Sequence, residues 1–414
     1  MENFTDLSRE LTSALDRETK KAHGIFFTPR SYRKQLIDYL RDDMNLRPKN
    51  ILEPSFGSGE FVADCVAAFP DASITGVELN ATLHERVVDH MKDTPNVALH
   101  HHDFLTFDTC DSKYDLIIGN PPYVVVKTGT PPGYESVTTG RPNLFCWFIF
   151  RSIQLLEDEG VLAFVVPNSI LNTAYYELLR KYIVERCDIV AIRHSGNDQS
   201  ASEFQETEQN TIAMVLKKTT HGSSGRFVVE HKNKVVFSLR YGYLNEMLGS
   251  HPVIEDLGLA VKTGTIVWNQ VKERLESDAT KGTLLIYASN IKRGAFVPFS
   301  EGKNDKKQFL RSPKPTLTGP MVLMNRGYGN SAYAPDLLFI DETNTGIGHA
   351  EFYVENHLNV IYPVSEEGRR NIRGVYEYLK SDASKEYIDI YTGNGAMSKT
   401  EISKMLPIIL PRSS

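Results

Sequence analysis

The chain has 414 residues, of which 41% are hydrophobic and 24% charged, and its formal net charge is −6 at pH 7. This length has room for two domains, and these fractions exclude disordered and collagen-like classes. No apolar run reaches the length of about 18 residues that predicts a membrane span, and the N-terminus lacks the apolar core of a signal peptide. The four cysteines are too scattered for a zinc site or a disulfide framework, which predicts reduced thiols in a cytoplasmic protein.

Strand-like and helix-like patterns alternate over the first 220 residues. Strands are predicted at 50–54, 73–79, 96–100, 114–120, 161–167 and 188–194. Helices are predicted between them at 59–69, 81–91, 144–160 and 175–187. This alternation predicts an α/β fold with a parallel sheet and helices on both faces, to which 211–218 and 226–232 could add antiparallel edge strands.

The pattern changes near residue 245, after which strands are shorter, Gly and Pro are frequent, and only 374–383 reads as a clear helix. We therefore predict two domains, 1–247 and 248–414, the second of them mixed and mostly β. The first 250 residues carry 26 basic and 33 acidic side chains, whereas the rest carry 20 and 19. A polyanionic partner would therefore meet the second domain.

Open α/β sheets bind ligands beyond the carboxyl ends of their strands. The first strand ends at Glu53 and Pro54. The loop after it contains Gly57 and Gly59, which permit a tight turn and the close approach of a ligand. Val62 stands where the dinucleotide fingerprint has its third glycine, and this disfavours a pyrophosphate ligand. The alternative is a loop that simply needs two glycines.

The next two strand ends supply the rest of an adenosine site. Glu78, followed by Leu79, lies about 20 residues beyond the glycines, which is the spacing of an acid that accepts from both ribose hydroxyls. After the third strand, Asp103 could accept from an adenine amino group while Phe104 lies on the ring. Alone, Glu78 could equally be a solvated acid at a strand end. Together these residues predict an adenosine cofactor without a diphosphate, and S-adenosyl-L-methionine fits that description.

The strand 114–120 runs into a stiff tetrapeptide whose residues we predict to be catalytic: Asn120, Pro121, Pro122 and Tyr123. Two successive prolines exclude a helix or a central strand, because neither nitrogen can donate a hydrogen bond. In methyl transfer to an exocyclic amino group, the side-chain oxygen of Asn120 and the carbonyl of Pro121 would accept from its two N–H groups and make the nitrogen nucleophilic. Tyr123 would stack on the base. The alternative is an ordinary Asn-Pro turn.

The series FFTP (26–29), EPSFGSGEF (53–61), VELN (77–80), DF, NPPY and GVLAFVVPNS (160–169) resembles the gamma-class N6-adenine DNA methyltransferases of restriction–modification systems, the TaqI-like type. The resemblance implies a Rossmann-like S-adenosylmethionine-dependent methyltransferase sheet followed by a target-recognition domain. It also implies double-stranded DNA as the substrate, a flipped adenine as the acceptor, and a possible companion restriction endonuclease.

The same resemblance implies further contacts with the cofactor and the base. Thr28 and Pro29 would cradle the methionine part of the cofactor, although a Thr-Pro pair also suits the start of a helix. Phe204 would hold the second face of the extruded adenine, or else it is a core anchor under a loop. Asn120 would contact both the cofactor and the base.

A basic segment of the second domain is a candidate for DNA contacts. Residues 291–314 contain seven basic and two acidic residues with interspersed phenylalanines. Phosphate contacts are predicted for Lys292, Arg293, Lys306, Lys307 and Arg311. The alternative is an ordinary solvated face. The C-terminal pattern that runs from 261–269 through 395–411 also resembles the specificity domains of restriction–modification systems.

Other functions share parts of this pattern. Enzymes that methylate the glutamine amide of release factors, and some RNA methyltransferases, also carry NPPY. The glutamine-amide enzymes are shorter, lack the leading FFTP segment and have no large C-terminal domain. A third alternative is a non-catalytic DNA specificity subunit, which the intact NPPY disfavours. Only about 20 residues precede FFTP, too few for a nuclease domain, so we expect an adenine-specific DNA methyltransferase without endonuclease activity.

Overall fold

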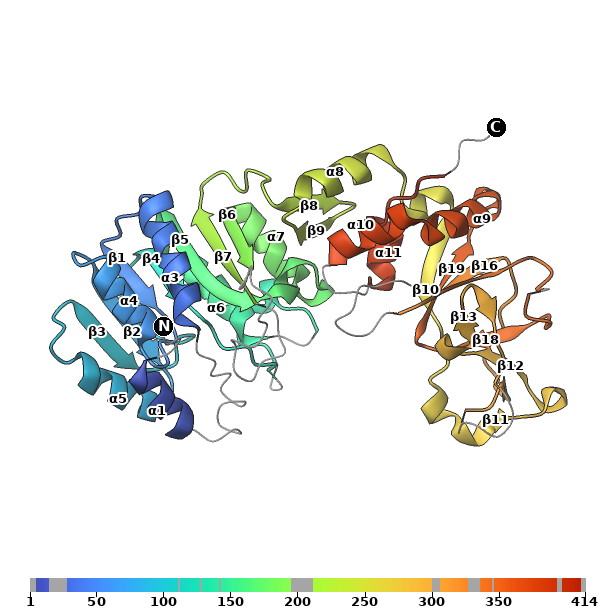
Figure 1. Ribbon diagram of the computed structural model, residues 1–414, viewed down its shortest axis with the longest axis horizontal. Coiled ribbons are helices and arrows are strands. Elements are labelled where there is room, and N and C mark those ends of the chain that lie inside the picture. Colours follow the sequence, from blue (N-terminus) through green and yellow to red (C-terminus); the bar gives the residue numbers. More distant parts are fainter. Residues whose placement is uncertain are drawn as a thin grey trace. The chain divides into compact units, whose positions relative to one another are not determined.

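A computed structural model describes residues 5–14, 28–110, 112–126, 129–140, 143–194, 211–299, 306–326, 336–344, 346–392 and 397–410. The chain forms two compact units (Figure 1). The first comprises the residues up to Val229 together with Val235–Leu239, and the second comprises Glu230–Lys234 and the residues from Arg240 onward. In these described ranges no helix is long and apolar enough to cross a membrane.

The first unit is built on a seven-stranded sheet in the order β3-β2-β1-β4-β5-β7-β6. Its strands are β1 (Asn50–Glu53), β2 (Ser73–Glu78), β3 (Val97–His101), β4 (Tyr114–Gly119), β5 (Leu156–Pro167), β6 (Cys187–His194) and β7 (Thr211–Lys218). Strands β1 to β5 pair in parallel, and β7 runs antiparallel to both of its neighbours. The predicted α/β fold is confirmed.

The two expected edge strands are not edges of this sheet. Strand β7 lies inside it, between β5 and β6. Every residue from Thr211 to Leu216 is buried, as expected for a strand covered on both faces. The segment at 226–232 instead forms β8 (Val228–His231), which pairs with β9 (Lys234–Phe237) in a separate two-stranded sheet.

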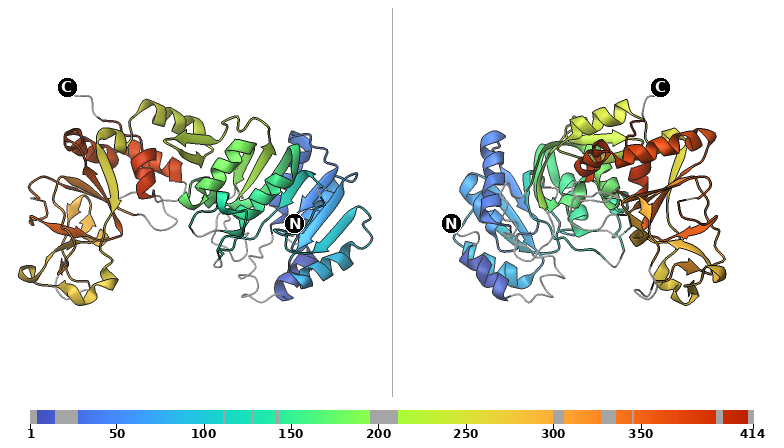
Figure 2. Two further views of the ribbon diagram at one scale, coloured as in Figure 1. Left: turned by 180° about the vertical axis from the view of Figure 1, so that it is seen from behind. Right: turned by 45° about the vertical axis from the view of Figure 1, so that its right-hand side comes forward.

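Helices cover both faces of the large sheet (Figures 1 and 2). They are α1 (Asp6–Ala14), α3 (Arg30–Asp38), α4 (Glu60–Ala68), α5 (Ala81–Met91), α6 (Leu144–Leu155) and α7 (Glu177–Arg186). Ile51 of β1 packs in one core cluster with α3 and α4, whereas Leu52 is equally buried and lies outside that cluster. Because side chains alternate along a strand, the second face is buried as well. Helix α6 ends at Leu155 rather than at 160, because Leu156 is already extended and begins β5.

The second unit is mixed. One antiparallel sheet consists of β10 (Leu259–Thr263), β19 (Leu358–Pro363), β16 (Met321–Asn325) and β17 (Leu337–Ile340). A second sheet consists of β11 (Leu275–Glu276), β15 (Phe309–Leu310), β12 (Thr283–Ile286) and β18 (Phe352–Val354). A small hairpin joins β13 (Ile291–Lys292) to β14 (Ala295–Phe296).

The second unit contains more helix than predicted: α8 (Tyr241–Ser250), α9 (Glu366–Lys380), α10 (Asp382–Thr392) and α11 (Lys399–Met405). Helix α9 begins at Glu366 because Ser365 caps it, accepting from the Gly368 N–H. Helix α11 begins with a Ser398–Glu401 capping box, a signal readable in the sequence. The predicted domain boundary at 247/248 falls inside α8, which belongs to the second unit. Leu244 and Leu248 are buried there, so the segment before the expected linker is structured.

Candidate functional site

A cavity at the carboxyl ends of β1, β2 and β4 collects many of the predicted site residues. It is lined by Thr28, Glu53, Pro54, Gly57, Glu78, Leu79, Asp103, Phe104, Asn120 and Pro122. Pro29, Gly59, Pro121 and Tyr123 stand beside these residues in the chain but do not line the cavity. Phe204 lies outside the described residues.

Sequence reasoning missed several cavity residues, among them Arg33, Glu60, His102, Leu144 and Phe148. Three of them carried a readable signal. His102 directly precedes Asp103, and Leu144 and Phe148 are four residues apart on one face of α6. No signal in the sequence indicated that Arg33 and Glu60 contact each other, because that contact depends on how α3 and α4 pack.

The loop after β1 is shaped by its glycines. Gly57 and Gly59 have φ angles of +53° and +75°, where side chains with a Cβ are strained. A Cβ on Gly59 would also lie 2.6 Å from Cγ1 of Val87 on α5. The loop thus delivers the chain into α4 while its backbone lines the cavity.

Glu78 is fixed by backbone donors on both sides. Its Oε2 accepts from the Gly57 N–H at 2.9 Å, and its Oε1 accepts from the Asn80 N–H at 2.7 Å. The carboxylate thereby couples the end of β2 to the Gly-rich loop. Its rotamer is set before any ligand arrives.

Two buried polar atoms on the cavity wall have no hydrogen-bond partner among the described residues, namely Thr28 Oγ1 and Glu53 Oε2. Burial, followed by the neighbouring Glu78 carboxylate, raises the pKa of Glu53 well above its usual range. A Cβ at position 119 would lie 2.1 Å from Glu53 Oε1, so Gly119 makes room for this carboxyl group. Unpaired buried polar atoms are rare, and two on one cavity indicate a site for a polar ligand.

The cavity wall also combines a carboxylate with aromatic rings. Asp103 is exposed, and its Oδ1 accepts from the Leu105 N–H at 2.9 Å. Phe104 is buried with its ring centroid 4.9 Å from that of Phe148. Arg151 donates to the Phe104 carbonyl at 2.8 Å and holds this segment in place.

The Asn-Pro-Pro-Tyr segment leaves β4 at the same edge. The Tyr123 hydroxyl lies 2.5 Å from Asn120 Oδ1 and 2.9 Å from the Val165 carbonyl, and its single proton can serve only one of them at a time. Burial raises the pKa of Tyr123 well above its usual range, so this hydroxyl stays protonated. The Tyr123 ring meets Phe145 edge to face, with the centroids 6.3 Å apart.

The basic residues predicted to contact DNA divide into two groups. Lys292 and Arg293 are exposed at the β13–β14 turn. The others are engaged within the second unit: Lys306 lies 3.5 Å from Glu355, Lys307 donates to the Leu275 carbonyl, and Arg311 pairs with Glu276 at 2.8 Å. Across the described segments, no group of three or more His, Cys, Asp or Glu side chains is arranged to hold a metal ion.

An antiparallel β7 inserted between β5 and β6, with a Gly-rich loop after β1 and an acid at the end of β2, defines the fold of S-adenosyl-L-methionine-dependent methyltransferases. Residues 65–200 match the Eco57I restriction-modification methylase family. A crystal structure of a putative class I S-adenosylmethionine-dependent methyltransferase from Listeria monocytogenes is 20% identical, with a TM-score of 0.41 over 51% of this chain and 68% of that chain.

Two curated proteins match almost the whole chain. Type II methyltransferase M.CvrRI of Paramecium bursaria Chlorella virus XZ-6E is 30% identical over 99% of this chain and 100% of its own length. Modification methylase CviBIII of Paramecium bursaria Chlorella virus NC1A is 37% identical over 99% of both chains. The chain belongs to the Type II restriction–modification methyltransferases. It is therefore a DNA methyltransferase, and its cofactor is S-adenosyl-L-methionine.

Proposed function

We propose that this chain methylates the exocyclic N6 amino group of adenine at a specific sequence in double-stranded DNA, as a gamma-class, TaqI-like modification enzyme. The observation that carries the proposal is that Asn120 and Pro122 line the same cavity as Glu78 and Asp103. The amide that would receive the target amino group is thus next to the carboxylates suited to an adenosine. Methyl donor and acceptor could meet there without a further conformational assembly.

The cavity residues fit the cofactor from one end to the other. Glu78 would accept from the ribose hydroxyls, and Asp103 with Phe104 would hold the adenine. At the methionine end, Glu53 Oε2 would face the ammonium group, and the Thr28 hydroxyl, beside Pro29, would donate to the carboxylate; neither atom has a hydrogen-bond partner among the described residues. When bound, the cofactor supplies an electrophilic methyl group on a positively charged sulfur.

The Asn-Pro-Pro-Tyr residues would prepare the acceptor nitrogen. Asn120 Oδ1 and the Pro121 carbonyl accept from the two amino protons and direct the nitrogen lone pair away from the ring. An amide oxygen can accept two hydrogen bonds, so a bond from the Tyr123 hydroxyl is compatible with this role. The Tyr123 ring supports one face of the base, and Phe204 is the candidate for the other.

The target adenine would have to leave the duplex, since its amino group cannot otherwise reach Asn120. The second unit would hold the duplex and choose the sequence. The exposed Lys292 and Arg293 are the best candidates for phosphate contacts. We further propose action in the cytoplasm alongside a companion restriction endonuclease. Family membership disfavours glutamine amides or RNA as acceptors, and the cavity disfavours a non-catalytic subunit.

The proposal is tested by incubating the purified protein with S-adenosyl-L-methionine and unmodified double-stranded DNA, then digesting the DNA for mass spectrometry. N6-methyladenine is the expected product, and sequencing the methylated DNA gives the target site. If the product were N4-methylcytosine, the assignments of fold and cofactor would hold, but adenine as the target base would be wrong. Methylated RNA or protein with unmethylated DNA would overturn the DNA substrate.

A further inference from the structure

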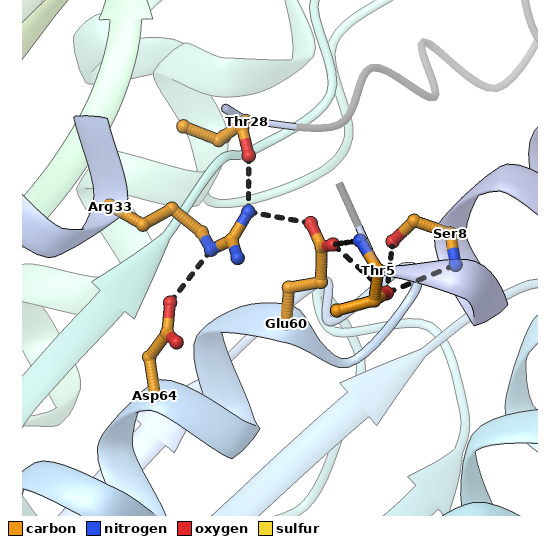
Figure 3. A network of polar contacts seen from close by, with 6 residues as sticks. All are labelled: Thr5, Ser8, Thr28, Arg33, Glu60 and Asp64. Carbon is orange, nitrogen blue, oxygen red and sulfur yellow. Dashed lines mark hydrogen bonds and ion pairs between the residues drawn. The ribbon is translucent and has the colours of Figure 1, made fainter. Parts of the chain in front are cut away.

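A buried arginine outside the predicted site joins two walls of the cavity. Arg33 of α3 is 2% exposed. Its Nη1 donates to the Thr28 carbonyl and, at 2.6 Å, to Glu60 Oε2, while its Nε donates to Asp64 Oδ2 at 2.7 Å (Figure 3). One guanidinium thus links the segment before α3 to the first two turns of α4.

The second oxygen of Glu60 extends this network to α1. Glu60 Oε1 accepts from the Thr5 N–H at 3.1 Å and lies 3.1 Å from the Thr5 hydroxyl. Thr5 Oγ1 in turn accepts from the Ser8 N–H at 3.2 Å, which caps the start of α1. Figure 3 shows the carboxylate between the guanidinium on one side and Thr5 on the other.

The network leaves one polar group of Thr28 for a ligand. Its carbonyl is held by Arg33, whereas its buried hydroxyl has no partner among the described residues. Thr28 and Gly57 are on the cavity wall, and so are Arg33 and Glu60, but Thr5 is not. Arg33 and Glu60 therefore fix the positions of two segments of the cavity wall, the one at Thr28 and the start of α4. Helix α1 contacts Glu60 through Thr5, which lies outside the cavity lining.

We propose that Arg33 and Glu60 are a positioning pair that sets the spacing between Thr28 and the Gly-rich loop at the methionine end of the cofactor. This inference rests on the proposed assignment of the cavity to the cofactor. The planar guanidinium donates to a carbonyl and two carboxylates from donors held in a fixed fork, a geometry that the compact ammonium group of lysine does not reproduce. Helix α1 is connected to this pair through the hydrogen bonds between Thr5 and Glu60.

The test measures cofactor affinity separately from turnover. Arg33→Met and Glu60→Gln should each weaken S-adenosyl-L-methionine binding by about tenfold or more, by the general effect of breaking a buried ion pair. The turnover number at saturating cofactor should stay within a few-fold of wild type. Arg33→Lys should recover part of the affinity. Thr5→Val should weaken binding by a few-fold although Thr5 does not line the cavity.

The two residues should act as one unit. The double variant, Arg33→Met with Glu60→Gln, should lose little more affinity than either single variant, because the second change breaks a pair already broken. Additive losses would overturn the pairing. If Arg33→Met fails to fold, the near-isosteric Glu60→Gln and Thr5→Val still decide the question. Unchanged affinity in both, with melting temperatures showing folded protein, would overturn the proposal.

Two controls separate this proposal from its alternatives. Arg180 is also buried, at 1% exposure, and donates to the carbonyls of Val235, Ile170 and Thr173 away from the cavity. Arg180→Met should lower the melting temperature without weakening cofactor binding; a loss equal to that of Arg33→Met would reduce Arg33 to a general stability role. Glu78→Ala tests the cavity itself. If Glu78→Ala weakens cofactor binding and the Arg33 and Glu60 variants do not, the cavity remains the cofactor site and the positioning role of the pair is wrong. If none of these variants weakens binding, both the cofactor site and the positioning role are wrong.

Discussion

At the residue scale, Tyr123 makes a contact that differs from its expected role as a stacking ring. Its hydroxyl lies within hydrogen-bond distance of Asn120 Oδ1 and of a β5 carbonyl. A hydroxyl that donates to the amide oxygen fixes which end of the Asn120 amide is presented to the target. We therefore assign Tyr123 two separable parts: a ring proposed to support the base, and a hydroxyl proposed to orient the Asn120 amide.

Tyr123→Phe keeps the ring and removes only the hydroxyl. We expect the turnover number to fall by about tenfold, equivalent to about 1.4 kcal/mol of transition-state stabilisation, with cofactor affinity unchanged. Asn120→Ala, which removes the acceptor, should cost about 100-fold or more. Single-turnover methylation of DNA, together with cofactor titration, measures both. Full activity in Tyr123→Phe would leave stacking as the only role of Tyr123.

Glu53 should couple cofactor binding to pH. Its raised pKa means that the cofactor-free protein holds this carboxyl protonated at pH values where a free Glu is ionised. A bound ammonium group favours the ionised form and lowers that pKa, so binding releases a proton and affinity rises with pH up to the raised pKa. Calorimetry in two buffers of different ionisation enthalpy should detect the proton, and Glu53→Gln should abolish it. Equal heats in both buffers for the wild type would contradict the assignment.

At the element scale, the loop between β1 and α4 depends on a conformation that only glycine adopts without strain. Gly59 has a φ of +75° and faces Val87 of α5, so this turn also sets how closely α4 and α5 pack. Gly59 does not line the cavity itself, but both the path of the loop that does and the packing of α4 against α5 depend on it. A change there should affect stability and cofactor binding together.

Gly59→Ala should destabilise the first unit by about 1–3 kcal/mol, since it combines a strained φ with a close contact, and should weaken cofactor binding. Thermal unfolding with and without cofactor measures both effects. Gly242→Ala is the matched control, because Gly242 lies in α8 and a Cβ there would meet no atom within 4 Å. A helical Gly→Ala change should be neutral or stabilising by up to about 1 kcal/mol. Equal melting temperatures for Gly59→Ala and wild type would show that the loop relaxes.

At the scale of the whole molecule, chemistry and recognition are proposed for different units. The first unit carries the cavity, and the second carries the exposed Lys292 and Arg293. Phosphate contacts contribute affinity without sequence information. Losing them should therefore weaken binding to every duplex alike and leave the chosen site unchanged.

Lys292→Ala and Arg293→Ala should each lower the slope of log affinity against log salt by about one, for target and non-target duplexes alike. Fluorescence anisotropy over a series of salt concentrations measures the slope. Lys385→Ala is the control, since Lys385 is an exposed lysine of the same unit that pairs with Asp382. A slope change as large in this variant would show that net charge alone accounts for the effect. An altered target sequence in either test variant would instead assign base contacts.

Much of the candidate site could be predicted because its residues follow their own strands. Glu53, Glu78, Asp103 and Asn120 each stand directly at or after a strand end, and parallel strands bring those ends to one edge of the sheet. The helices were predicted less well where sequence signals were short. Helix α11 and the start of α9 depend on single capping residues, which carry little weight beside a weak apolar pattern.

The sequence by itself determined the α/β alternation, the glycine loop, the acids at the strand ends and the Asn-Pro-Pro-Tyr segment, because each is encoded by a few consecutive residues. Only the tertiary structure decided that β7 lies between β5 and β6, since strand order depends on long-range pairing. It also decided that Arg311 pairs with Glu276 and that Arg33 reaches Glu60 and Thr28. Such contacts depend on how separate elements pack against one another, and no local pattern records that packing.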